Sequence, residues 1–258
     1  MPGRVVAVLA LALLVAAPAL AANRFGTSKS DRMRGTKLSD RMSGLKGNDR
    51  VFGAAGKDRI FGNTGNDRVS GGAGNDRLNG GAGRDTVLGG AGDDRVYGAR
   101  DRDRLSGGTG NDLVLGAGAK DRLNGGSGND TLLGGLDGDL LVAGAGDDEL
   151  RGEAGDDRMR GEAGADELHA GEGNDTLVGA EGDDDLDGGP GNDTIVGGPG
   201  EDVFHIRADG TPEGGEGDDV IDARDGEADT INCGPGNDRV LVDAEEEGVI
   251  DCEEVVEP

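Results

Sequence analysis

Gly71-Gly72-Ala73-Gly74-Asn75-Asp76-Arg77-Leu78-Asn79 is one copy of a nine-residue unit that repeats along most of this chain. Its first six residues favour a turn, because Gly permits positive φ and Asn and Asp tolerate it best among the other residues. Its last three residues alternate polar, apolar and polar, which is typical of a short strand with one side chain inward. Nine residues cannot bury a face alone, so we expect stacked copies whose short strands pair with the copy above.

The repeat keeps its phase over twenty units, counted by the aspartate at position six of each unit, from Asp31 to Asp202. The residue two positions after each of these aspartates is always apolar. Glycine occupies position one in 18 units, with Ala143 and Ala170 as the exceptions, and it occupies position four in 15 units. This regularity predicts an elongated stack of equivalent coils.

The composition excludes a conventional two-layer globular core. The 258 residues include 54 Gly, 4 Phe, 1 Tyr and no Trp, and the net charge is −27. Too few large apolar side chains are available to fill a thick core. Low hydrophobicity with a high net charge is otherwise typical of disorder, so something other than a thick core has to hold an ordered chain together.

The stacked aspartates predict a bound cation. Neighbouring strands lie about 4.8 Å apart, and carboxylates at that spacing repel each other strongly in a partly desolvated turn. Calcium takes six to eight oxygen ligands from carboxylates and carbonyls in flexible geometry, whereas magnesium requires a strict octahedron and retains its waters. Glycine-rich turns expose carbonyls beside each aspartate, so the sequence favours calcium.

The pattern G-G-x-G-x-D-x-U-x resembles the RTX, or haemolysin-type, calcium-binding nonapeptide repeat. The resemblance extends from Gly26 to His205, with looser copies to Val242. It implies an all-β fold, a right-handed parallel β-roll solenoid of about ten coils with two repeats per coil. Calcium would lie between stacked turns, held by glycine carbonyls and by the position-six aspartates.

The calcium ligands that the resemblance implies are Asp49, Asp58, Asp67, Asp76, Asp85, Asp94, Asp103, Asp112, Asp121, Asp130, Asp139, Asp148, Asp157, Asp166, Asp175, Asp184, Asp193 and Asp202. Weaker ligands are expected at Asp31, Asp40, Asp219 and Asp238. In the first two units Lys29 and Leu38 replace the position-four glycine, which is why their sites are expected to be weak or absent. Three internal units are expected to have distorted turns because the same glycine is replaced by Asp101, Ala119 and Asp137.

Four segments are expected along the chain: a signal peptide (1–22), degenerate repeats with an N-terminal cap (23–43), the regular calcium-binding β-roll (44–205), and irregular repeats with a C-terminal cap (206–258). The first segment has a basic residue at Arg4, a short apolar run and an Ala19-Leu20-Ala21 cleavage site. These features are typical of a Sec-type secretory signal, and an uncleaved membrane anchor is the alternative. Cys233 and Cys252 predict a disulfide in an exported protein, with two free thiols as the alternative.

Charge is divided unequally along the chain. Residues 23–130 carry 19 Lys and Arg against 14 Asp, a net +5, whereas residues 131–258 carry 6 Arg against 39 acidic residues, a net −33. Nine arginines at position seven are expected to point outward in two ladders: Arg32, Arg41, Arg50, Arg59, Arg68, Arg77, Arg95, Arg104 and Arg122. The ladders are candidates for binding extracellular anionic polymers, or they only solubilise the faces and offset the aspartates.

An apolar stripe is expected on one side of the stack. Tyr97, Leu115 and Leu133 occupy the outward position nine of alternate units, and Leu113 lies beside them. The stripe is a candidate surface for self-association. The alternative is that these residues only reflect strand propensity.

The sequence contains no supported catalytic constellation. His169 and His205 are far apart in the sequence, and no G-x-S-x-G nucleophile motif is present. We therefore expect no enzymatic activity and predict a secreted, calcium-binding structural or interaction protein that folds on calcium binding. The alternatives are a calcium-stiffened adhesin or polymer binder, and a remnant or accessory module of a secreted enzyme or toxin.

Overall fold

The computed structural model describes residues 21–191, 193–206, 211–216, 220–223, 231–233, 237–242, 252 and 254–256. In this part of the chain the regular secondary structure is all β, with no helix. The strands are β1 (Asn23–Phe25), β2 (Arg32–Arg34), β3 (Arg41–Lys46), β4 (Arg50–Ala55), β5 (Arg59–Thr64), β6 (Arg68–Ala73), β7 (Arg77–Ala82), β8 (Thr86–Ala91), β9 (Arg95–Arg100), β10 (Arg104–Thr109), β11 (Leu113–Ala117), β12 (Arg122–Ser127), β13 (Thr131–Leu136), β14 (Leu140–Ala145), β15 (Glu149–Ala154), β16 (Arg158–Ala163), β17 (Glu167–Glu172), β18 (Thr176–Glu181), β19 (Asp185–Gly189), β20 (Thr194–Pro199), β21 (Val203–Ile206), β22 (Thr211–Glu216), β23 (Val220–Ala223), β24 (Arg239–Val242) and β25 (Glu254–Val256).

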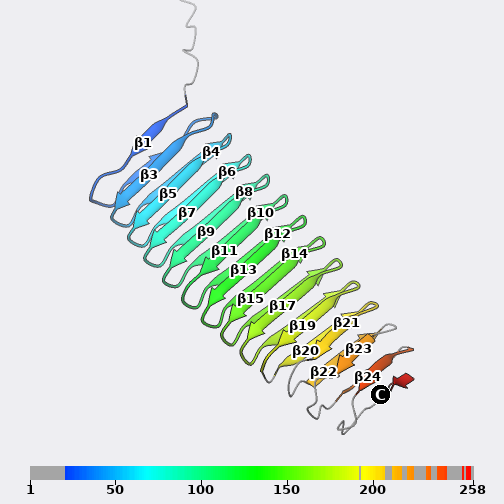
Figure 1. Cartoon of the computed structure of the whole chain (residues 1–258). Helices are drawn as coiled ribbons and strands as arrows, with labels where there is room; N and C mark the ends of the chain where they lie inside the picture. The colour runs from blue at the N-terminus through cyan, green and yellow to red at the C-terminus, as the bar shows by residue number, and fades with distance from the viewer. Residues whose placement is uncertain are drawn as a thin grey trace, which may run out of the picture.

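Two parallel sheets extend along the length of the described chain (Figure 1). The 14-stranded sheet has the order β1-β3-β5-β7-β9-β11-β13-β15-β17-β19-β21-β23-β24-β25, and the 11-stranded sheet contains the even-numbered strands from β2 to β22. Each strand pairs with the strand two units along the chain, so that Arg104 of β10 lies beside Arg122 of β12. Two repeats therefore form one coil, and about 11 coils form a β-solenoid. The predicted parallel β-roll architecture is confirmed.

The core is a row of inward side chains from position eight of each unit. Leu105 of β10 pairs with Leu123 of β12, and their side chains are 3% and 2% exposed. The row continues through Leu132 and Leu186 to Phe204, all fully buried. Each coil thus adds one apolar residue per sheet, which is how a chain poor in large apolar residues builds a continuous core.

The strands are longer than the three residues that the sequence pattern predicts. Most of them span six residues, from position seven of one unit to position three of the next. The prediction was wrong in length because the main chain of the glycine-rich positions also pairs between coils, as Gly108 does with Gly126. Left-handed backbone at positions two and four, with φ of 112° at Gly72 and 115° at Gly74, then reverses the chain.

Three internal turns lack the position-four glycine, and their backbone differs from that of the other turns. The φ angle is 66° at Asp101, 68° at Ala119 and 68° at Asp137, whereas the glycines at this position from Gly47 to Gly191 have φ from 108° to 154°. Residues with a Cβ favour a narrow left-handed well, whereas glycine is free to adopt larger positive φ. These three turns therefore keep their direction with altered geometry, and the expected distortion is confirmed.

The repeat loses its regular phase after Asp202. In the regular coils, paired residues are two nine-residue units apart, as Arg104 and Arg122 are. The pairing of Thr194 with Thr211 is one residue shorter than this spacing, and that of Val220 with Arg239 is one residue longer. The pairing of Arg239 with Glu254 is three residues shorter. The last described coils therefore belong to the same stack but vary in length around the regular 18 residues.

A disulfide joins Cys233 to Cys252, with their Cα atoms 5.2 Å apart. Cys233 is fully buried in the core, and Cys252 packs against it. The predicted pairing is confirmed, and it links the last described segment of the chain to the stack.

The predicted signal peptide, residues 1–22, lies outside the described residues except for Ala21 and Ala22. Within the described part of the chain there is no helix with the length and hydropathy needed to cross a membrane.

Candidate calcium-binding turns

The position-six aspartates form two columns, because stacked coils place equivalent turns above one another at both edges of the solenoid (Figure 1). One column contains Asp49, Asp67 and every second repeat aspartate after them, and the other contains Asp40, Asp58 and their equivalents. From Asp40 to Asp202, each of these side chains is at most 5% exposed. Burial removes water from these carboxylates, so the free-energy cost of burying them depends on the partners that they find within the turn.

One carboxylate oxygen of each aspartate is used in a ladder between coils. The backbone N–H of Asp85 donates to Oδ1 of Asp103 at 2.7 Å, and the N–H of Asp103 donates to Oδ1 of Asp121 at 2.7 Å. The same bond recurs along both columns with lengths of 2.6 to 2.9 Å. This ladder holds each carboxylate in a fixed orientation within its turn.

Within the described chain, the second carboxylate oxygen has no hydrogen-bond partner and no contact with solvent in sixteen successive units. These atoms are Oδ2 of Asp49, Asp58, Asp67, Asp76, Asp85, Asp94, Asp103, Asp112, Asp121, Asp130, Asp139, Asp148, Asp157, Asp166, Asp175 and Asp184. A buried polar atom without a partner costs about 1–3 kcal/mol, and more when it is charged. A positively charged ligand beside each of these sixteen oxygens would offset that cost.

The position-one glycine leaves a small space beside this oxygen. A Cβ added to Gly116 would lie 2.6 Å from Oδ2 of Asp121 and 2.7 Å from the carbonyl oxygen of Gly134, one coil away. Both oxygens thus border a space that any larger side chain would fill. Within the described residues, no three His, Cys, Asp or Glu side chains gather into a metal-binding group, so a metal here needs backbone carbonyls as well. A carboxylate oxygen with nearby carbonyls is the donor set that calcium prefers.

The turn carboxylates from Asp58 to Asp184 hold protons more tightly than usual. Burial, together with the neighbouring carboxylates of Asp85 and Asp121, raises the pKa of Asp103 to about 8, although a backbone hydrogen bond with Asp85 lowers it. Burial likewise raises the pKa of Asp85 to about 7 and that of Asp76 to about 6. A positive ion beside Oδ2 would reverse this tendency by stabilising the ionised form.

A model of the RTX calcium-binding nonapeptide repeat, covering four copies, matches residues 25–60, 34–69, 61–96, 70–105, 97–132, 133–168, 169–204 and 213–240. The chain belongs to the RTX calcium-binding repeat family. A search of curated proteins found no match. Membership confirms the resemblance seen in the repeats, and it implies that calcium is the ligand of the RTX turns described above.

The first two RTX units differ from the later ones in how Oδ2 is used. In the first unit the backbone N–H of Thr27 donates to Oδ2 of Asp31 at 2.6 Å, and the Thr27 hydroxyl donates at 2.9 Å. In the second unit the N–H of Thr36 donates to Oδ2 of Asp40 at 2.5 Å. The threonine at position two therefore supplies hydrogen bonds that satisfy each of these carboxylates. This role of the threonines was not predicted from the sequence.

The remaining predicted RTX ligands lie in the C-terminal coils. Asp193 and Asp202 are buried at the ends of the two regular columns, and Oδ1 of each accepts the N–H of the aspartate one coil earlier. Asp238 is fully buried, and its carbonyl oxygen accepts the N–H of Glu254 at 3.0 Å. Asp219 lies outside the described residues.

The nine position-seven arginines of the RTX roll are exposed, and they form a ladder on each sheet. Arg41, Arg59, Arg77 and Arg95 lie on four successive strands of the 14-stranded sheet. The others lie on the 11-stranded sheet, where Thr86 interrupts the ladder. In the described structure none of the nine forms an ion pair or hydrogen bond through its side chain.

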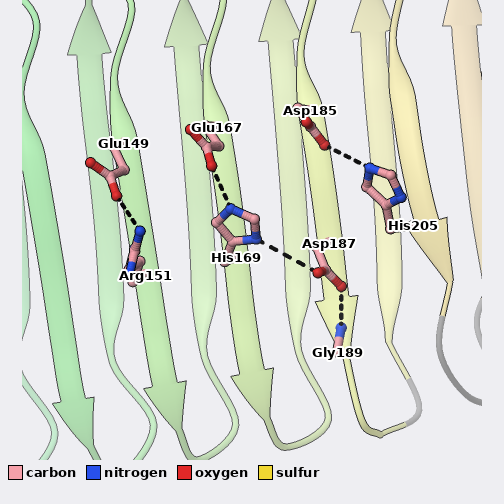
Figure 2. A network of polar contacts seen from close by, with 8 residues as sticks. All are labelled: Glu149, Arg151, Glu167, His169, Asp185, Asp187, Gly189 and His205. Carbon is pink, nitrogen blue, oxygen red and sulfur yellow. Dashed lines mark hydrogen bonds and ion pairs between the residues drawn. The ribbon is translucent and has the colours of Figure 1, made fainter.

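An unforeseen polar network lies on the outer face of β15, β17, β19 and β21 (Figure 2). A ring nitrogen of His169 lies 2.7 Å from Glu167 and the other lies 3.6 Å from Asp187, while His205 lies 3.2 Å from Asp185. The two histidines are two coils apart on the same sheet, and the period of two units per coil could have placed them on one face. The sequence reading treated them as unrelated.

Proposed function

We propose that this RTX protein is a secreted structural or interaction protein whose roll folds as calcium binds. The observation that carries the proposal is the row of sixteen buried Oδ2 atoms without partners. Like charges stacked at the coil spacing oppose folding, and a ligand that binds only the folded form stabilises it. The unfolded chain, with its large net negative charge, would remain expanded.

The position-six aspartates from Asp49 to Asp202 would hold the calcium, together with carbonyls of turn glycines such as Gly134. Bound calcium would supply the positive charge that lets these buried carboxylates stay ionised. The chain contributes orientation through the Oδ1 ladder and exclusion of water through burial. Asp31 and Asp40 would not take part, because threonines already satisfy their Oδ2 atoms.

Export of the protein is supported by two observations. RTX repeat proteins are typically extracellular, and a disulfide is typical of an oxidising compartment. The apolar run before Ala19-Leu20-Ala21 would act as a Sec-type signal peptide. Calcium-dependent folding would then take place only after export. The proposed role is non-enzymatic.

Two neighbouring aspartates provide a matched test of the ligand assignment. Asp94 is buried with Oδ2 free, whereas Asp93 is exposed and accepts Nδ2 of Asn75 at 2.9 Å. Asp94→Asn and Asp93→Asn remove the same charge one residue apart. In a calcium titration of folding followed by circular dichroism, we expect Asp94→Asn to move the midpoint to higher calcium and Asp93→Asn to leave it nearly unchanged. Equal midpoints for the two variants would refute the ligand assignment.

A second function, binding of extracellular anionic polymers, is favoured by the arginine ladders. Arg50 and Arg68 stand on adjacent strands one coil apart, and neither has an ion-pair partner among the residues that the structure describes. Unpaired guanidinium groups at this spacing would attract a polyanion at low salt. We expect the calcium-loaded chain to bind heparin, and Arg50→Glu with Arg68→Glu to weaken that binding several-fold. A calcium-loaded chain that does not bind heparin at low salt would remove this second candidate.

A further inference from the structure

The outer face of the 14-stranded sheet carries opposite charges at its two ends. At position seven, four arginines on β3 to β9 are followed by two uncharged residues on β11 and β13, and then by three acidic residues on β15 to β19. The order along the sheet is Arg41, Arg59, Arg77, Arg95, Leu113, Thr131, Glu149, Glu167 and Asp185. All nine side chains are partly or fully exposed.

The middle of the same face is apolar. At position nine, Tyr97, Leu115 and Leu133 lie on the adjacent strands β9, β11 and β13, and Arg151 follows on β15. All three apolar side chains are half-buried rather than covered by another part of the described chain. The apolar stripe predicted from the sequence is therefore present, and it lies between the basic and the acidic ends of the face.

This arrangement is complementary to itself when the strand order is reversed. Reflection of the strand order about the line between β11 and β13 places β9 opposite β15, β7 opposite β17 and β5 opposite β19. It therefore matches Arg95 with Glu149, Arg77 with Glu167 and Arg59 with Asp185. Because the face is present in both partners, each match would occur twice.

We propose that two copies of this chain form an antiparallel dimer through the outer faces of their 14-stranded sheets. The two-fold axis runs along the strand direction between β11 and β13, so position seven of one copy meets position seven of the other. At the centre, Leu115 of each copy packs against Leu133 of the other. The ring of Tyr97 meets the guanidinium of Arg151, a favourable cation–π arrangement.

The charges select the antiparallel arrangement. In a parallel dimer through this face, the four arginines of the basic end would face those of the second copy, and the acidic ends would also face each other. Like-charge juxtaposition of this kind disfavours the parallel arrangement. In the antiparallel dimer the basic end meets the acidic end of Figure 2, where Glu149 already holds Arg151 at 2.7 Å. The arginines of the basic end have no partner within the described chain.

The 11-stranded sheet lacks this complementarity. Its position-seven residues after Arg122 are Leu140, Arg158, Thr176 and Thr194, with no acidic column to match the arginines. The second ladder therefore stays exposed in the dimer and remains available to other partners. It also offers control positions, because its arginines have the same exposure and spacing.

The interface is of modest size. The ten strands from β3 to β21, spaced about 4.8 Å apart, give a face about 48 Å long. With a width of roughly 10 Å on each copy, the dimer buries about 1,000 Å² in total, near the lower limit for specific interfaces. We therefore expect a dimer that dissociates in the micromolar range and weakens with salt.

Sedimentation equilibrium of the calcium-loaded chain, with folding checked by circular dichroism, tests the proposal. Two double variants reverse opposite ends of the face: Arg77→Glu with Arg95→Glu, and Glu149→Arg with Glu167→Arg. We expect the unmodified chain to dimerise and each double variant alone to be at least tenfold weaker. An equimolar mixture of the two should regain the dimer, because every reversed charge then meets its opposite in the heterodimer.

Arg50→Glu with Arg68→Glu on the 11-stranded sheet is the matched control and should leave dimerisation unchanged. The proposal is overturned if the folded, unmodified chain stays monomeric at about 200 µM, well above a micromolar dissociation constant. It is also overturned if the control variant dissociates as readily as the other two, or if mixing the two reversed variants restores no dimer. Misfolded variants could not form a dimer when mixed. Recovery of the dimer on mixing therefore shows that each variant failed to dimerise because of its charges and not because it failed to fold.

Discussion

Alanine substitutions at two glycines of one coil distinguish the filling of the space beside the aspartate from a general effect on packing of the turn. Gly116 occupies position one, and a Cβ there would lie 2.6 Å from Oδ2 of Asp121 and 2.7 Å from the carbonyl oxygen of Gly134. At Gly118 the nearest atom to an added Cβ is 4.0 Å away. Neither glycine has a left-handed φ, so alanine strains the backbone at neither position. Gly116→Ala and Gly118→Ala therefore differ only in what the methyl group meets.

The expected cost follows from these contacts. At Gly116 the methyl has to displace the Asp121 carboxylate, whose Oδ1 is held by the N–H of Asp103 at 2.7 Å. Overpacking of this kind costs about 1–3 kcal/mol, or roughly 2–12 °C in melting temperature for a chain of this size. Gly118→Ala should lie within about 0.5 kcal/mol of the unmodified chain. Ala143 occupies position one in another unit, so the fold tolerates a methyl group at position one although it lowers stability.

Thermal unfolding in saturating calcium, followed by circular dichroism, measures the difference between the two variants. We expect a lower melting temperature and a higher calcium midpoint for Gly116→Ala alone. Equal melting temperatures for both variants would refute the reasoning, because the space beside Oδ2 would then have no energetic role.

Other consequences concern pH, the disulfide and the core. Because burial raises the folded-state pKa of aspartates such as Asp103 to about 8, the calcium-free chain should regain folded structure as pH falls from 8 to 5, since protonation removes the repulsion between its carboxylates; a circular dichroism spectrum in chelator with more β structure at pH 8 than at pH 5 would contradict this. Cys233→Ser with Cys252→Ser should destabilise the C-terminal coils by about 3 kcal/mol, detected as faster amide exchange there and not near β5. Leu132→Ala, at a fully buried position, should cost about 2–5 kcal/mol in calcium, and a denaturation midpoint equal to that of the unmodified chain would exclude a continuous core.

The sequence predicts the stack, the core row and the turn columns well, because each depends on a side chain that recurs every nine residues. Strand length was missed, since main-chain pairing at glycine-rich positions such as Gly108 leaves no side-chain signal. The C-terminal coils could not be predicted because successive coils there differ in length, as the pairings of Val220 with Arg239 and of Arg239 with Glu254 show. No fixed period is present there to follow.

The aspartates from Asp40 to Asp202 that the sequence predicted for the turns are buried there, but the sequence did not predict how each of their oxygens is used. The aspartate period indicates which carboxylates line the turns, but only the coil geometry shows that Oδ1 is engaged and Oδ2 is free. The satisfaction of Asp31 by Thr27 depends on a local contact that no repeat pattern encodes. The opposite charges on the 14-stranded sheet become visible only when alternate units are assigned to separate sheets.

The most direct test of calcium-coupled folding is the circular dichroism spectrum of the full chain in millimolar calcium and in excess chelator at pH 7.5. Like charges at the coil spacing should keep the calcium-free chain unfolded, because its carboxylates then have no counter-ion. We predict a β spectrum in calcium that is lost in chelator and returns when calcium is restored. A β spectrum of equal intensity in chelator would contradict the account.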